Sequence, residues 1–161
     1  MNKKYNSTDL FLMNRSIALA KEGIGKGGGP FGAVIARDGI IISEAYNEVV
    51  ISSDPSAHAE VLAIRRACEK LGTHNLAGLT LYASCEPCPM CFGAIYWAGL
   101  SRVFFACGRH DASDAGFGDE EFYTEMGKSP DERRIQFIHI EEADGKGVFE
   151  EWEMNDKKIR Y

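Results

Sequence analysis

Apolar residues recur along this chain with two spacings, one typical of helices and the other typical of strands. Helical spacing covers four segments, residues 8–23, 54–72, 87–99 and 148–158. The first two segments end at Gly23 and Gly72, and glycine commonly terminates a helix. The third begins with a proline, which is favoured in a first helical turn. We therefore expect a helix in each of these segments.

Short apolar runs predict strands between the helices. They lie at residues 32–47, 79–84, 101–108 and 134–140. The first of these contains two runs around Arg37-Asp38-Gly39, and an Asp-Gly pair between apolar runs is typical of a β-hairpin. Strands that alternate with helices predict a three-layer α/β/α sandwich around a mixed sheet, with the hairpin as its antiparallel part.

A glycine-rich segment, KGGGPFG at residues 26–32, interrupts these patterns. Because glycine has no Cβ, such a loop is able to bring its backbone close to a neighbouring group. The chain contains no internal repeat, low-complexity tract or linker. We therefore expect one domain over residues 1–161.

Composition and charge narrow the classes of function. Hydrophobic residues make up 45% of the chain and charged residues 26%, as in globular proteins, and the net charge is −6 at pH 7. This acidity disfavours general binding to nucleic acids or anionic membranes. No apolar run is long enough to cross a bilayer, and the N-terminus lacks the pattern of a secretory signal. Five cysteines, three of them clustered, favour a reducing cytoplasm.

The clustered cysteines, Cys85, Cys88 and Cys91, lie in the segment SCEPCPMC. An iron–sulfur cluster would need a fourth cysteine, but Ile95 occupies the expected position. A closed structural zinc site with all three cysteines and a histidine is an alternative, in which the protein is a non-enzymatic zinc module.

A different set of donors indicates a catalytic zinc ion. His58, Cys88 and Cys91 supply one nitrogen and two sulfurs, which leaves a fourth tetrahedral position open for water. Both ligand segments lie where helices are predicted to begin, and helix N-termini favour thiolates. Glu60, two residues after His58, is then placed to act as a general base. H-x-E followed by P-C-x-x-C is the signature of zinc-dependent nucleobase deaminases.

Longer segments resemble one family within that group. GGPFGAVI, PSAHAEVLAIRRAC, LYASCEPCPMCFGAIYWA, DAGFGDEEFY and the terminal KKIRY resemble bacterial guanine deaminases of the cytidine-deaminase-like superfamily. This resemblance implies a mixed sheet of five strands between helices and one Zn²⁺ per chain. It also implies a homodimer whose subunits exchange their C-terminal segments, about residues 147–161.

The resemblance further implies which residues contact the substrate. They are Phe31, Asn47, Trp97, Asp119 and Tyr161. Phe31 would stack on a purine ring, and Tyr161 would reach the pocket of the partner subunit. Asp119 would accept hydrogen bonds from the N–H groups of the base, with Glu120 and Glu121 as alternatives.

The expected reaction converts guanine and water to xanthine and ammonia. Guanine carries both donors and acceptors, so it suits a pocket with a carboxylate acceptor and an amide donor. Glu60 would act first as a base and then as an acid. The alternatives are a deaminase of the tRNA wobble adenosine, of guanosine or of another small amino-heterocycle. The acidic charge disfavours the tRNA alternative.

Overall fold

The computed structural model describes residues 4–160, which form two compact units divided between Asp119 and Glu120. The helices of the first unit are α1 (Ser7–Gly25), α2 (Val49–Ser52), α3 (Ala59–Leu71), α4 (Pro89–Trp97) and α5 (Arg109–Asp114). Its strands are β1 (Gly29–Arg37), β2 (Ile40–Asn47), β3 (Thr80–Cys85) and β4 (Arg102–Cys107). The second unit contains α6 (Glu120–Met126), the 3₁₀ helix η1 (Pro130–Glu132) and α7 (Gly145–Met154). None of the helices within residues 4–160 is long and apolar enough to cross a membrane.

The strands of the first unit form one mixed sheet in the order β2-β1-β3-β4. Strand β1 pairs antiparallel with both β2 and β3, whereas β3 and β4 are parallel. The β1–β2 connection is the predicted hairpin. Its central residues Asp38 and Gly39 have φ angles of 49° and 81°, the positive values that a type I′ turn requires.

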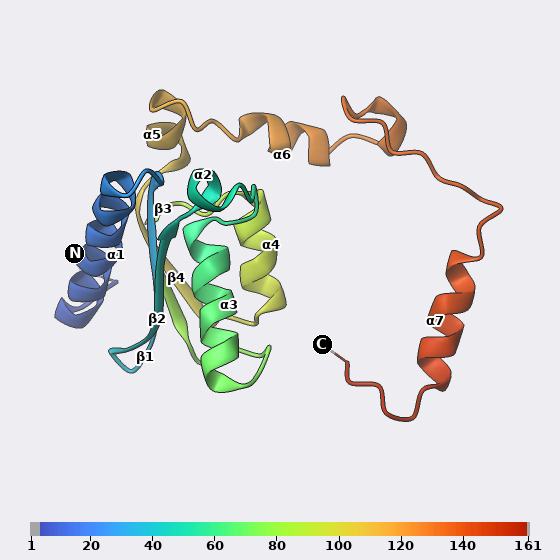
Figure 1. Cartoon of the computed structure of the whole chain (residues 1–161), viewed down its shortest axis with the longest axis horizontal. Coiled ribbons are helices and arrows are strands. Elements are labelled where there is room, and N and C mark those ends of the chain that lie inside the picture. Colours follow the sequence, from blue (N-terminus) through green and yellow to red (C-terminus); the bar gives the residue numbers. More distant parts are fainter. Residues whose placement is uncertain (1–3, 161) are drawn as a thin grey trace. The chain divides into compact units, whose positions relative to one another are not determined.

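Helices cover both faces of this sheet, which confirms the predicted three-layer sandwich. Figure 1 shows α1 on one face and α3 with α4 on the other. Between α1 and the sheet, Leu12 and Leu19 pack in a cluster with Val34 and Tyr82. On the opposite face, a larger cluster joins the apolar sides of α3 and α4 to the inward residues of β1 and β3. Because the apolar faces of α3 and α4 are packed against the sheet in this cluster, the first residues of both helices have fixed positions relative to the sheet.

The prediction of a fifth strand is wrong for the residues that the structure describes. The segment 134–140 is irregular and lies in the second unit, whose described part contains no strand. A strand needs a neighbour to satisfy its backbone hydrogen bonds, and this segment has none within its unit. Its alternating apolar side chains, which suggested a strand, are exposed there.

The ends of the predicted helices differ from the observed ends by a few residues. The first three predicted helices correspond to α1, α3 and α4, and the last, predicted at residues 148–158, is α7. Helix α7 begins earlier because the Asp144 carboxylate accepts a hydrogen bond from the Gly147 N–H and caps its first turn. The short helices α2 and α5 were not predicted, since four and six residues show too little periodicity.

Candidate active site

The first residues of α3 and α4 bring the predicted metal ligands together. His58 is the N-cap of α3 and Cys88 is the N-cap of α4, and neither side chain caps its own helix. Their main-chain carbonyl oxygens accept the first hydrogen bonds of the two helices: the Leu62 N–H donates to the His58 carbonyl, and the Phe92 N–H donates to the Cys88 carbonyl. Both side chains therefore remain available for another partner.

The donor atoms of His58, Cys88 and Cys91 form a compact group. His58 Nδ1 lies 3.5 Å from the sulfur of Cys88 and 3.5 Å from the sulfur of Cys91. All three donor atoms lie within 4.8 Å of one another. A tetrahedral zinc ion with ordinary bond lengths separates its nitrogen and sulfur ligands by about 3.6 Å. One nitrogen and two sulfurs at this spacing fit zinc.

Cys85 does not join this group. It ends β3 with a buried side chain, and its thiol lies 3.6 Å from the Gly108 carbonyl oxygen. Burial raises the pKa of this thiol to about 11, and its sulfur is not among the donor atoms that lie within 4.8 Å of one another. Within residues 4–160 the group therefore has three protein donors, which leaves room for a fourth, exchangeable ligand.

Burial and hydrogen bonding set the charge of the side chains around this group. Glu60 is only 7% exposed, and burial raises the pKa of its carboxyl group. The Cys91 thiol donates to Cys88, and this hydrogen bond, together with His58, lowers the pKa of Cys88 to about 4. The pKa of Cys91 is raised by the same hydrogen bond and by burial. A carboxyl group with a raised pKa can both accept and donate a proton near neutral pH.

Main-chain hydrogen bonds place two of the predicted substrate residues near these ligands. The Glu48 N–H donates to the Ala57 carbonyl at 2.9 Å, so Asn47 lies next to the segment that carries His58. The Gly32 N–H donates to the Ser84 hydroxyl at 2.9 Å, so Phe31 lies beside the end of β3, just before the cysteine segment. Asn47 is buried and Phe31 is half-buried.

The positions of the other predicted substrate residues are less closely defined relative to the three donors. Trp97 is the last residue of α4 and is 71% exposed, and Asp119 is half-buried at the end of the first unit. Glu120 and Glu121, the alternatives to Asp119, begin α6 in the second unit. Tyr161 lies outside the described residues. The roles of these side chains stay predictions.

Phe117 is a neighbour of the site that the sequence analysis did not single out. Its ring contacts Phe31 edge to face, with centroids 5.1 Å apart and planes at 89°. The loop that carries Phe117 follows α5, and α5 is tied to the cysteine segment because the Arg109 N–H donates to the Glu86 carboxylate at 3.2 Å. An aromatic residue between glycines, as in AGFGD, was the available signal.

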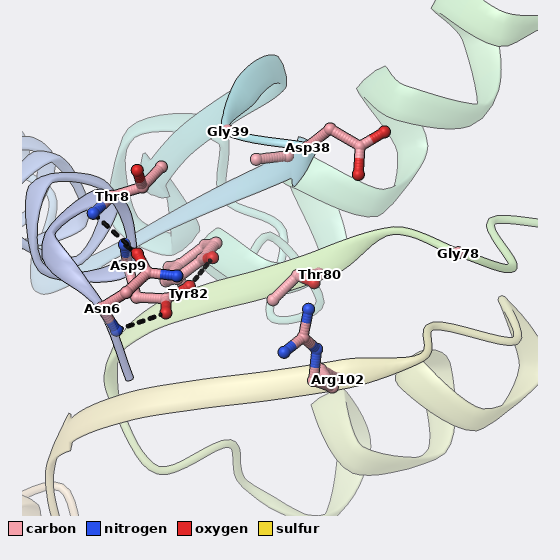
Figure 2. Close-up of a pocket in the computed structure, with 10 residues that line it drawn as sticks. Asn6, Thr8, Asp9, Asp38, Gly39, Gly78, Thr80, Tyr82 and Arg102 are labelled. Atoms are coloured by element: carbon pink, nitrogen blue, oxygen red, sulfur yellow. Dashed lines mark hydrogen bonds between the residues drawn. The ribbon is translucent and has the colours of Figure 1, made fainter. Parts of the chain in front are cut away.

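A separate pocket of about 270 Å³ lies at the other end of β3, around the start of α1 (Figure 2). The Tyr82 hydroxyl donates to the Asp9 carboxylate there at 2.6 Å, and the Asn6 N–H donates to the same carboxylate at 2.8 Å. None of the predicted site residues lines this pocket. Its polar groups anchor α1 to the sheet, and it is distinct from the candidate active site.

Comparison with known proteins decides the family. The model for the cytidine and deoxycytidylate deaminase zinc-binding region matches residues 6–107, which include all three donors and Glu60. The chain belongs to this deaminase family. The matched region ends at the last residue of β4, so the family domain coincides with the sheet and the helices that carry the donors.

Other members of the deaminase family differ in how much of this chain they resemble. Guanine deaminase of Bacillus subtilis is 49% identical over 150 residues, which cover 92% of this chain and 96% of the relative. The solved structure of a B. subtilis guanine deaminase superposes with a TM-score of 0.93 at 47% identity and covers 98% of this chain and 99% of its own. The tRNA-specific adenosine deaminase of Aquifex aeolicus is 42% identical over 96 residues, 60% of this chain and 64% of its own length.

A second guanine deaminase structure, from Nitrosomonas europaea, gives an intermediate likeness. It superposes with a TM-score of 0.65 at 35% identity and covers 68% of this chain and 64% of its own. The likeness to the B. subtilis protein thus extends beyond the matched deaminase region into the second unit, whereas the match to the A. aeolicus relative is slightly shorter than that region.

Proposed function

We propose that the chain is a zinc-dependent guanine deaminase, a hydrolase that converts guanine and water to xanthine and ammonia. The observation that carries this proposal is the three-donor group beside the buried Glu60 carboxyl group. Likeness to guanine deaminases over nearly the whole chain supports guanine as the base. A free purine substrate places the activity in purine breakdown or salvage.

His58, Cys88 and Cys91 are the side chains that would hold the zinc ion. When bound there, zinc supplies Lewis-acid activation of the attacking water. The two cysteines donate negative charge and the positive ends of α3 and α4 face the donor group, because His58 and Cys88 are their N-caps. Cys91 is fully buried, which anchors the group in the interior between the two helices.

Glu60 is the proton carrier of the proposed mechanism. It removes a proton from the water that attacks C2 of guanine and delivers that proton to ring N3. Glu60 then takes the proton of the new C2 hydroxyl and delivers it to the exocyclic amine, the C2–N bond breaks as the C2 carbonyl of xanthine forms, and ammonia departs. The raised pKa of Glu60 suits this double role, since the group must be a base and then an acid near neutral pH.

The remaining predicted residues are proposed to bind the base. Phe31 stacks on the ring, and the Asn47 amide donates a hydrogen bond to an acceptor of guanine. Asp119 accepts from its N–H groups, and Trp97 lines the wall. Adenine would leave such buried polar groups unpaired, at about 1–3 kcal/mol for each group.

The subunit arrangement and compartment extend the proposal. We propose a homodimer in the cytoplasm, in which residues 1–161 act as one domain and the segment 147–161 is exchanged, so that Tyr161 reaches the partner subunit's pocket. All five cysteines are free thiols, which suits a reducing compartment. Removal of residues 156–161 should then raise KM for guanine without changing the zinc content.

A tRNA adenosine deaminase is the second candidate, favoured by the 42% identity to the A. aeolicus relative. The net charge of −6 disfavours it, because tRNA binding relies on basic surfaces. Incubation with free bases, guanosine and an anticodon stem-loop, followed by assays for ammonia and inosine, separates the candidates. We expect ammonia from guanine alone. Inosine in the stem-loop without xanthine from guanine would reject the proposal.

A further inference from the structure

The glycine-rich segment predicted to approach a neighbouring group lies against Asn47. Gly28 leaves no space for a larger residue and Gly29 leaves little: a Cβ atom on Gly28 would be 2.3 Å from the Asn47 carbonyl oxygen. A Cβ on Gly29 would be 3.0 Å from Asn47 Oδ1 and 3.1 Å from its Cγ. Gly29 and Asn47 are also paired residues of β1 and β2, next to an irregularity in the register.

A hydrogen bond from Val49 indicates which end of the Asn47 amide binds a ligand. The Val49 N–H donates to Asn47 Oδ1 at 3.2 Å, and Asn47 as a whole residue is 6% exposed. The oxygen of the amide therefore accepts a hydrogen bond from the protein backbone, which orients the amide. The amide nitrogen, which can only donate, remains for the substrate.

We propose that Gly29 is a positioning residue that holds the Asn47 amide in the orientation needed to donate to guanine. This inference deepens the proposed function and rests on it. A Cβ on Gly29 would lie 3.0 Å from the amide oxygen that also accepts from the Val49 N–H, so the absence of a side chain at position 29 leaves the amide its space in this orientation. A methyl group at position 29 would displace the amide by a few tenths of an ångström, because its nearest contacts would be shorter than ordinary van der Waals distances.

Kinetics of the Gly29→Ala variant test the proposal. We expect kcat/KM for guanine to fall about threefold to tenfold, mainly through KM, since one substrate hydrogen bond is weakened. Gly25→Ala is the matched control, because a Cβ on this glycine near the end of α1 would have nothing within 4 Å, and it should leave both constants unchanged. Unchanged kinetics in Gly29→Ala, with unchanged zinc content, would overturn the proposal.

A double-mutant cycle separates positioning from a general structural effect. If Gly29 acts through Asn47, Gly29→Ala should have no further effect on kcat/KM in an Asn47→Ala background. Additive losses would contradict the proposal. If Gly29→Ala fails to fold, Asn47→Asp tests the assigned orientation of the Asn47 amide. The aspartate keeps an oxygen that accepts from the Val49 N–H, but an oxygen replaces the amide nitrogen that would donate to guanine. The variant should bind zinc normally and lose most of its affinity for guanine, and retained affinity would overturn the assigned orientation.

A crystal structure of Gly29→Ala distinguishes failure of this inference from failure of the proposed function. If wild-type protein does not deaminate guanine, the proposed function fails whatever the variant does. The position of the Asn47 amide in the variant still judges the role of Gly29. A displaced amide supports positioning, and an amide in its wild-type position rejects it.

Discussion

At the scale of single residues, the candidate site depends on groups whose neighbours change their chemistry. Glutamate is usually exposed in proteins, yet Glu60 is buried in the first turn of α3, two residues after the proposed zinc ligand His58. Cys85 and Cys88 are three positions apart and have opposite character, since burial raises the pKa of one and hydrogen bonds lower that of the other. Position in the fold, and not residue type alone, separates ligand from core.

Replacement of Glu60 with glutamine should abolish turnover and leave the fold intact. The amide keeps the size of the carboxyl group but cannot carry a proton, so kcat should fall by at least about 10²-fold to 10⁴-fold. Zinc content and melting temperature should stay at wild-type values, which elemental analysis and calorimetry check. Turnover within tenfold of wild type would contradict the role of Glu60.

Replacement of Phe117 with alanine should weaken substrate binding through Phe31. An edge-to-face aromatic pair contributes about 0.5–1.5 kcal/mol, so KM for guanine should rise about twofold to tenfold while kcat changes little. Phe117→Tyr should restore KM because it restores the ring. Phe11→Ala, a change at an exposed phenylalanine of α1, is the control and should leave KM unchanged.

At the scale of elements, the sequence predicted those helices and strands whose residues follow a regular local spacing. The hairpin was predictable because Asp38-Gly39 separates two apolar runs, and α3 was predictable from its apolar face and from Gly72, which ends it in a left-handed conformation. The strand predicted at residues 134–140 is wrong because apolar residues alternate there as they do in a strand, although the segment is irregular and these residues are exposed. Contacts such as that of Gly29 with Asn47 depend on strand register, which no local pattern encodes.

The buried hydrogen bond between α1 and β3 should make stability depend on pH. The hydrogen bond from Tyr82 and that from the Asn6 N–H lower the pKa of Asp9 below its ordinary value of 3.8. A carboxyl group with a lowered folded-state pKa contributes stability above the unfolded pKa and loses it as the pH falls through the folded one. We expect Tyr82→Phe to lose about 1–3 kcal/mol of unfolding free energy at pH 7.

The loss should shrink as the pH falls below about 4, because Asp9 then becomes protonated in both proteins. Denaturant unfolding of wild type and Tyr82→Phe at several pH values measures this difference. In an Asp9→Asn background, the loss of unfolding free energy caused by Tyr82→Phe should not depend on pH in this way. A loss that stays constant from pH 7 to pH 3 would contradict the assignment to Asp9.

At the scale of the whole molecule, the deaminase fold carries one group of three metal donors within the described residues. The deaminase motifs were visible in the sequence because H-x-E and P-C-x-x-C each occupy one helix start, and the structure brings the two starts together. The substrate residues were less predictable, since they come from β1, β2, the end of α4 and the loop before α6. Phe31 and Asn47 precede Gly32 and Glu48, whose N–H groups donate to Ser84 and Ala57 close to the ligand segments.

Cys85→Ser should leave the metal in place, since its thiol lies against Gly108 and outside the donor group. The variant should retain one zinc per chain after dialysis, whereas Cys91→Ser should lose it, because a ligand is removed from the three. Elemental analysis of both variants, purified side by side, checks this. Release of zinc by Cys85→Ser would indicate a closed, structural site.

X-ray absorption at the zinc edge of the purified wild-type protein tests the central claim most directly. The account predicts one zinc per chain bound by two sulfur atoms and two lighter atoms, one of them the His58 nitrogen and the other from an exchangeable ligand. A shell with three sulfurs would contradict it, because Cys85 would then occupy the position that the proposed reaction needs open.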